Sequence, residues 1–179
     1  PFKDIFQLTL DQIHHLRVRR ELNTSQIIYL SSQQSLFKGR IQVQNSKKVF
    51  FKAEEHEKLI TRPNSITLLA CPIKSDLYQL VIQKAVELGV DRIIPLISEF
   101  TQGKDYKKKY HSLHKTIELA CSQSRQVQCP TLLDPIKISE LYTCDIENFI
   151  VSDWQSSSRT FPTLSKSSSI GLLVGPEGG

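Results

Sequence analysis

The chain has 179 residues, of which 39% are hydrophobic and 23% charged, and its formal net charge is +5 at pH 7. A chain of this length can bury a core without disulfides, and no apolar run approaches the ~20 residues that span a bilayer, so a membrane protein is not expected. The four cysteines form no CxxC pair, which predicts neither a zinc site nor a disulfide framework but reduced thiols in the cytoplasm.

The first predicted domain covers residues 1–64 and is rich in β-structure. Thr9, followed three residues later by Gln12, is typical of a capping box and predicts a helix over residues 10–20. Short strands are then expected at 26–30, 35–44 and 47–55. The domain is expected to end at TRPNS, residues 61–65, because proline and asparagine disfavour regular structure.

In the second predicted domain, residues 65–179, strand and helix patterns alternate. Strands are expected at 65–73, 91–98 and 169–175, with further apolar segments at 131–135 and 148–154. Long helices are expected from Ser75, placed as a cap, to Gly89, placed as a stop, and over 105–126, with a short helix near 138–142. Such alternation predicts an α/β fold, with a mostly parallel sheet whose ligands bind at the carboxyl ends of its strands.

Each long helix carries a predicted apolar stripe. The stripe of the first helix consists of Leu77, Leu80, Val81, Lys84, Ala85 and Leu88. The stripe of the second consists of Tyr106, Tyr110, Leu113, Ile117 and Cys121. Lys84 and Glu87 lie three residues apart, which allows a surface ion pair or, alternatively, an amine that points toward a site.

The last strand runs into GPEGG, residues 175–179. Glycine lets main-chain N–H groups approach a ligand closely, so this loop is suited to backbone contact with anionic or acceptor atoms. No GK[ST] follows and the GxGxxG spacing is absent, so neither a Walker loop nor a dinucleotide fold is indicated. A plain tight turn stays an alternative, and so does an anion loop of a phosphate-binding α/β hydrolase.

Basic residues gather in two places. His14, His15, Arg17, Arg19 and Arg20 crowd the first helix, and KDYKKKYHSLHK occupies residues 104–115. Lysine and arginine neutralise phosphates, although a solvated helix face is the simpler interpretation of the lysine run. The five histidines show no metal-ligand pattern, so no metal is expected.

Several segments together resemble the RsmE family of SPOUT methyltransferases. They are LLVGPEGG at 172–179, IQKAVELGV at 82–90, IIPLISE at 93–99 and ELACSQS at 118–124. IHHLRVRR at 13–20 is similar to a pattern of the family's N-terminal barrel. The chain departs from the family where it has Phe100 in place of an arginine, and where Ser122-Gln123-Ser124-Arg125 stands for Glu-Gln-Ser-x-Arg.

The resemblance implies the fold and the activity. The fold is a PUA-like β-barrel followed by a SPOUT α/β domain with a trefoil knot, which a further segment beyond Gly179 completes. The activity is methylation of N3 of a uridine in 16S ribosomal RNA by a homodimer that uses S-adenosylmethionine. The alternative is an RNA-binding fragment or degenerate relative without catalytic activity.

The resemblance also assigns site residues, although no catalytic residue is predicted. The expected cofactor-binding residues are Leu173, Val174, Gly175, Glu177, Gly178 and Gly179. The expected RNA-binding residues are His14, Arg17, Arg20, Lys84 and Arg125.

Overall fold

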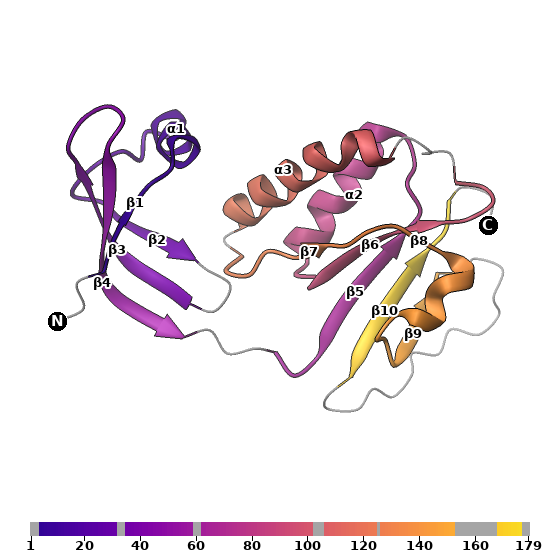
Figure 1. Cartoon of the computed structure of the whole chain (residues 1–179). Helices are drawn as coiled ribbons and strands as arrows, with labels where there is room; N and C mark the ends of the chain where they lie inside the picture. The colour runs from indigo at the N-terminus through magenta and orange to yellow at the C-terminus, as the bar shows by residue number, and fades with distance from the viewer. Residues whose placement is uncertain are drawn as a thin grey trace. The chain divides into compact units, whose positions relative to one another are not determined.

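The structure, a computed structural model, describes residues 4–31, 35–58, 62–101, 106–124, 126–152 and 168–176, with the side chains of residues 75 and 106–109 excepted. The chain divides into two compact units, Pro1–Ile60 and Thr61–Gly179 (Figure 1). The division falls beside the TRPNS segment.

The first unit is an antiparallel sheet with one helix. Its elements are β1 (Ile5–Gln7), α1 (Leu10–Val18), β2 (Ile27–Ser31), β3 (Ser35–Val43) and β4 (Val49–Lys58). The strand order is β1-β4-β3-β2, with antiparallel pairing throughout. The buried apolar side chains of this unit are Leu8, Ile13, Ile41, Val49, Phe51 and Ala53. This sheet fits a barrel-like domain.

The capping box predicted at the start of α1 is confirmed. The N–H of Gln12 donates to Thr9 Oγ1 at 3.3 Å, and the N–H of Thr9 donates to Gln12 Oε1 at 2.9 Å. These bonds satisfy N–H groups that would otherwise be unpaired at a helix start. The helix ends at Val18, two residues before the predicted end, and the chain leaves it through Arg20 in a left-handed conformation with φ of 56°.

The second unit is a parallel sheet with α2 and α3 on one face (Figure 1). Its elements are β5 (Ser65–Ala70), α2 (Ser75–Glu87), β6 (Arg92–Ile97), α3 (Tyr106–Ser124), β7 (Thr131–Leu132), β8 (Ile136–Lys137), the 3-10 helix η1 (Ile138–Thr143), β9 (Asn148–Val151) and β10 (Ser169–Val174). The main sheet has the order β7-β6-β5-β10-β9, and β8 pairs with β6. All these pairings are parallel, so the predicted α/β fold with a mostly parallel sheet is confirmed.

Alternate side chains of the central strands enter two separate apolar layers. Leu68 and Ile93 point to the layer under α2 and α3. Leu69 and Ile94, their neighbours along the strands, point to the opposite layer, which contains side chains from the β8–η1 segment. Since both faces are covered, the strands of this sheet consist of near-continuous apolar runs.

The stripe through which α2 packs differs from the predicted one. The predicted stripe includes Leu77, Leu80 and Leu88, but they are 46%, 49% and 83% exposed. The side chains of α2 that are buried are Tyr78, Ile82, Ala85 and Val86. Of the predicted stripe, Ala85 is therefore confirmed, and Val81 packs partly buried against the same core. Apolar residues occur on more than one side of this helix, so two stripes fit the helical period and only the contact with the sheet distinguishes them.

The ends of α2 give one correction and one confirmation. The predicted cap at Ser75 is wrong, because Ser75 is already the first helical residue and Lys74 holds the N-cap position without a side-chain hydrogen bond. Gly89 ends the helix as predicted, with φ of 82° and its N–H donating to the carbonyl of Val86 at 2.9 Å. Glycine adopts this left-handed conformation at little steric cost.

Asp91 connects the beginnings of β5 and β6. Its Oδ2 accepts a hydrogen bond from the N–H of Ile66 at 2.8 Å, and its Oδ1 accepts one from Arg62 Nη2 at 2.8 Å. The same guanidinium donates to the carbonyl of Gly89 at 2.8 Å. Arg62 therefore fixes the chain where it enters the second unit.

Asp91→Ala is expected to lower the free energy of unfolding of the second unit by about 1–3 kcal/mol, because the partly buried N–H of Ile66 loses its acceptor. Urea unfolding measures the change. Asp134→Ala is the control, since Asp134 is exposed and its loss should cost no more than about 0.5 kcal/mol. Equal midpoints for the two variants would contradict the assigned role of Asp91.

Candidate functional site

The carboxyl ends of β5, β6, β9 and β10 lie along one edge of the parallel sheet. Gly175 and Pro176 follow β10 at this edge, and Ser152 follows β9. Open α/β sheets bind ligands outside the carboxyl ends of their strands, where side chains do not fill the space between connections. This edge is therefore the candidate site.

Hydrogen bonds hold the segments at this edge in place. The N–H of Cys71, just after β5, donates to the carbonyl of Val174 at 3.0 Å. On the other side of β10, the N–H of Ser152 donates to the carbonyl of Leu173 at 3.0 Å. The end of β10 is thus fixed from both neighbours, which gives the residues that follow it a rigid starting point.

A small polar cluster at this edge was not predicted from the sequence. The thiol of Cys71 donates to Ser98 Oγ at 3.7 Å, and Thr101 Oγ1 accepts the N–H of Ser98 at 2.7 Å. Cys71 and Thr101 are both buried. The sequence signal that could have indicated this cluster is the pair of hydroxyl residues, Ser98 and Thr101, just after the apolar run of β6. Residues that follow a parallel strand lie at its carboxyl end, where ligands bind.

The structure describes three of the six predicted cofactor-binding residues. Leu173 packs partly into the layer that contains Leu69, whereas Val174 is 42% exposed. Gly175 is exposed, and within the described part of the chain its N–H makes no hydrogen bond. An N–H that has no acceptor among the described residues, on a residue that itself lacks a Cβ and beside an exposed apolar side chain, fits a ligand that combines acceptor atoms with apolar surface. The other three predicted residues, Glu177, Gly178 and Gly179, lie outside the described residues.

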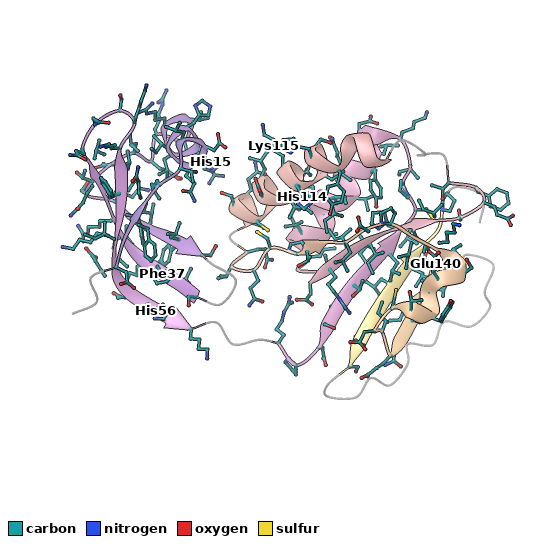
Figure 2. The ribbon with its side chains drawn as sticks, in the orientation of Figure 1. His15, Phe37, His56, His114, Lys115 and Glu140 are labelled. Carbon is teal, nitrogen blue, oxygen red and sulfur yellow. The ribbon has the colours of Figure 1, made fainter. Side chains whose placement is uncertain are left out.

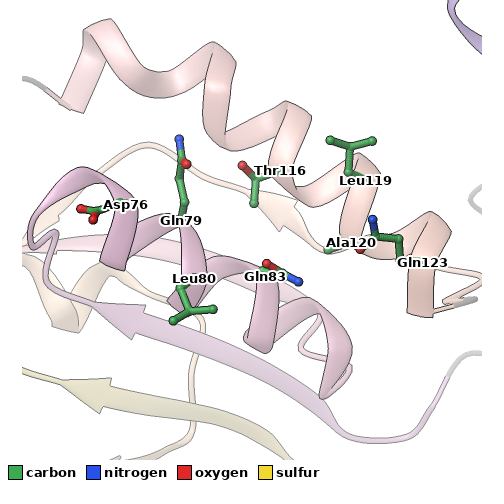
Figure 3. A pocket seen from close by; sticks show the side chains of 8 residues that line it. All are labelled: Asp76, Gln79, Leu80, Gln83, Thr116, Leu119, Ala120 and Gln123. Atoms are coloured by element: carbon green, nitrogen blue, oxygen red, sulfur yellow. The ribbon is translucent and has the colours of Figure 1, made fainter. Parts of the chain in front are cut away.

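A groove of about 390 Å³ lies elsewhere, between α2 and α3 (Figure 3). Its lining is mainly amide, hydroxyl and aliphatic, and consists of Asp76, Gln79, Leu80, Gln83, Thr116, Leu119, Ala120 and Gln123. Asp76 is the one ionisable residue of this lining, so the groove offers no positive charge to a phosphate. It lies along the helices rather than at the strand ends.

Three predicted RNA-binding residues belong to the first unit. His14 and Arg17 lie three positions apart on α1, and Arg20 follows the helix. All three are exposed. Arg17 Nη2 donates a hydrogen bond to the carbonyl of Ser46, in the turn between β3 and β4.

Lys84 lies in the last turn of α2, away from Gly175, because α2 leaves the carboxyl edge and returns toward the amino ends of the strands. Its Nζ contacts Glu87 Oε2 at 2.7 Å, and this hydrogen bond, with a further one from Gln83, lowers the pKa of Glu87. The surface ion pair, one of the two predicted alternatives, is thus present. Arg125 lies outside the described residues, and an RNA contact of either residue stays a prediction.

Two of the described histidines contact aromatic rings. His56 stacks on Phe37 with ring centroids 4.8 Å apart (Figure 2). His114 lies edge-on to Tyr110, with ring centroids 4.6 Å apart. Among the residues that the structure describes, no group of three potential metal ligands comes together. In the same residues, no helix is long and apolar enough to cross a membrane.

Two thiols interact at the end of α3. Cys121 is buried and Cys129 is exposed. A hydrogen bond with Cys129, together with burial, raises the pKa of Cys121. The same hydrogen bond lowers the pKa of Cys129, because the thiol of Cys121 stabilises the Cys129 thiolate by donating to it.

Iodoacetamide is expected to modify Cys129 faster than Cys71 or Cys121 at neutral pH, because the thiolate is the nucleophile and Cys129 is accessible. Cys121→Ala removes the donor and should slow the modification of Cys129, as measured by mass spectrometry of labelled peptides. Cys144→Ala is the control and should leave the rate unchanged. An unaltered rate in Cys121→Ala would show that the two thiols do not interact.

A family model described as an RNA methyltransferase domain matches residues 61–179, the same span as the second unit. The ribosomal RNA small subunit methyltransferase E of Aquifex aeolicus is 22% identical to the chain over 171 residues. That match covers 94% of this chain and 74% of the relative.

Two solved structures are similar over both units. One is a ribosomal RNA small subunit methyltransferase E from Neisseria gonorrhoeae, bound to S-adenosyl methionine, which superposes with a TM-score of 0.87 at 24% identity. The superposition covers 100% of this chain and 76% of that protein's chain. A methyltransferase from Legionella pneumophila, in complex with the bound cofactor SAM, has a TM-score of 0.84 at 25% identity, with 99% and 76% covered. The fold is therefore shared with these proteins.

Proposed function

We propose, from the premise that this chain belongs to the RNA methyltransferase family, that it transfers a methyl group from S-adenosylmethionine to RNA of the small ribosomal subunit. The relative from Aquifex aeolicus, which carries that activity in its name, supports this choice of RNA. The target atom that we propose is N3 of a uridine in 16S ribosomal RNA, on the resemblance to the RsmE family.

The observation that carries the proposal is the N–H of Gly175, which has no acceptor among the described residues, beside the exposed side chain of Val174 at the carboxyl edge of the sheet. We propose that this N–H and the side chains of Leu173 and Val174 hold the cofactor. Glu177, Gly178 and Gly179 complete the proposed set. Because β10 is fixed by hydrogen bonds on both sides, the residues after it start from a defined position.

Methylation of uracil N3 needs an in-line approach of the nitrogen to the methyl carbon and loss of the imide proton. The cofactor supplies the methyl group on a sulfonium. The proposed role of the protein is alignment, which by itself can supply a large part of the rate acceleration. No covalent intermediate with the protein is required, and we assign no proton acceptor within this chain.

We propose that the first unit binds the RNA. His14, Arg17 and Arg20 present basic side chains to solvent from α1 and the residues after it. Contacts with phosphates would position the RNA without reading its sequence. Lys84 and Arg125 of the second unit are further proposed contacts.

The resemblance supports four more proposals. The first unit is a PUA-like barrel, and the second carries a trefoil knot. The protein acts as a homodimer. It works in the cytoplasm, where small ribosomal subunits are found.

The test uses the protein at its full coding length, radiolabelled S-adenosylmethionine and small ribosomal subunits from a strain that lacks the gene. We expect label in one uridine of 16S ribosomal RNA, and a stop of reverse transcription at that position, because a methyl group on N3 blocks the base-pairing edge. Label in large-subunit RNA alone, or at another atom, would overturn the proposal. Binding of the RNA without incorporation of label would favour the non-catalytic alternative.

A further inference from the structure

The basic surface of the first unit includes a second segment besides α1. This segment is the turn between β3 and β4, residues 44–48, and Figure 1 shows α1 and this turn toward the same end of the unit. The guanidinium of Arg17 joins the two through its hydrogen bond to the carbonyl of Ser46. A residue predicted to bind RNA thus also holds a neighbouring loop.

The turn has a defined conformation set by Asn45. Its Oδ1 accepts the N–H groups of Lys47 and Lys48, each at 2.9 Å. The N–H of Gln44 closes the turn on the carbonyl of Lys48 at 3.0 Å. An asparagine that bonds its own turn in this way fixes the backbone, so the two lysines extend from an ordered base.

Both lysines are exposed and uncompensated. Lys47 and Lys48 are solvent-exposed, and neither forms an ion pair within the described part of the chain. Lys38, on β3, differs in this respect, because its Nζ contacts Glu55 Oε1 at 2.9 Å. The turn therefore offers two positive charges to a polyanion, whereas the charge of Lys38 is already matched.

Arg20 adds an independent observation. With φ of 56°, it occupies the position after α1 at which glycine is usual, and the N–H of Glu21 closes the motif on the carbonyl of Leu16 at 2.8 Å. A residue that carries a Cβ is sterically disfavoured in this left-handed conformation. Such local conflicts concentrate at functional sites, which supports a role for the arginine in binding.

We infer that the β3–β4 turn is a second phosphate-binding segment of the RNA surface. Lys47 and Lys48 contact RNA phosphates, while Asn45 and Arg17 act as positioning residues for the turn. The inference rests on the proposed function, because it takes RNA as the partner. It extends the RNA surface from a single helix to two connected segments.

The experiment measures the affinity for a labelled 16S ribosomal RNA fragment by fluorescence anisotropy over a series of salt concentrations. For the double variant Lys47→Glu, Lys48→Glu, the slope of log affinity against log salt should fall by about two, roughly one for each phosphate that is no longer neutralised. The dissociation constant at low salt should rise by about tenfold or more. Asn45→Ala changes no charge, yet it should lower the slope as well, because the two lysines would lose their fixed positions. If Asn45 contributed only to the stability of the fold, the slope would stay the same.

The matched control is Lys58→Glu, compared with Lys48→Glu. Lys58 is exposed on the same unit at the other end of β4, roughly 30 Å from the turn at about 3.3 Å per residue, and it undergoes the same charge change. Its slope should equal that of the wild type. Equal reductions for Lys58→Glu and Lys48→Glu, or an unchanged slope in the double variant, would overturn the inference.

The failure of this inference is distinguishable from failure of the proposed function. Wild-type protein that binds the fragment but transfers no methyl group would refute the proposed function. The salt slopes of the lysine variants would still show whether the turn contacts RNA phosphates. Normal methyl transfer with unchanged slopes in the variants would refute only the inference. Wild-type protein that does not bind the fragment would refute both.

Discussion

Gly39→Ala is expected to unfold the first unit while the second unit stays folded. A Cβ at position 39 would lie 2.0 Å from the carbonyl oxygen of Lys52 and 2.9 Å from Phe51 Cζ. Gly39 lies where the register between β3 and β4 shifts, so the backbone of β4 approaches it too closely for a side chain. The neighbouring atom at the shorter distance is backbone, and only movement of the strand can relieve the overlap.

The expected loss is about 3 kcal/mol or more. This equals the lower end of the stability expected for a unit of sixty residues, roughly 3–9 kcal/mol at about 0.05–0.15 kcal/mol per residue, so a marginally stable unit would unfold. Hydrogen exchange measured by mass spectrometry should show that β3 and β4 lose protection while β5 and β6 keep theirs. Gln42→Ala, an exposed change on the same strand, is the control; equal protection in both variants would contradict this packing of β3 against β4.

The largest expected effect on activity follows from Gly178→Val. If the residues after β10 hold the cofactor as proposed, a branched side chain at position 178 takes up space that the ligand needs. Methyl transfer should fall by about 100-fold or more, the scale of effect that a misplacement of about 1 Å produces. Gly178→Ala, with a smaller side chain, should give an intermediate loss.

Two measurements accompany this prediction. Calorimetry should show that the valine variant binds S-adenosylmethionine much more weakly than the wild type. Thermal unfolding in the absence of cofactor should be unchanged, because the substitution acts on the ligand and not on the core. Wild-type methyl transfer by the variant would remove Gly178 from the proposed site.

Local signals in the sequence predicted local structure well. The capping box at Thr9 and the helix stop at Gly89 are determined by neighbouring residues, and both are confirmed. The stripe of α3 is confirmed for Leu113, Ile117 and Cys121, which are buried, and for the partly buried Tyr110. The side chain of Tyr106 lies outside the described residues.

Features that depend on distant contacts were not predicted. β1 is three residues long and exists because it pairs with residues 50–52 of β4. The predicted stripe of α2 is confirmed for Ala85 and for the partly buried Val81, and it is wrong for Leu77, Leu80 and Leu88. The helical period of this segment allows more than one apolar face. The position of β10 between β5 and β9 follows from pairing across a long stretch of chain, which no local pattern indicates.

The match over residues 61–179 places the chain in the RNA methyltransferase family, in agreement with the resemblance found in the sequence. Parallel strands with apolar runs were enough to place the candidate site at their carboxyl ends. The cluster of Cys71, Ser98 and Thr101 was not predicted, since Cys71 follows β5 whereas Ser98 and Thr101 follow β6, and only the sheet brings the ends of these two strands together. The assignment of individual cofactor and RNA contacts stays a prediction.

The most direct test of the proposed cofactor site follows the main-chain N–H of Gly175 by NMR while S-adenosylmethionine is added to the isotope-labelled protein at its full coding length. We expect a saturable shift of this signal, with larger changes along residues 173–179 than in β6 or α3. A Gly175 signal that does not move while the cofactor binds, or the absence of any binding, would contradict the proposal that the loop after β10 holds the methyl donor.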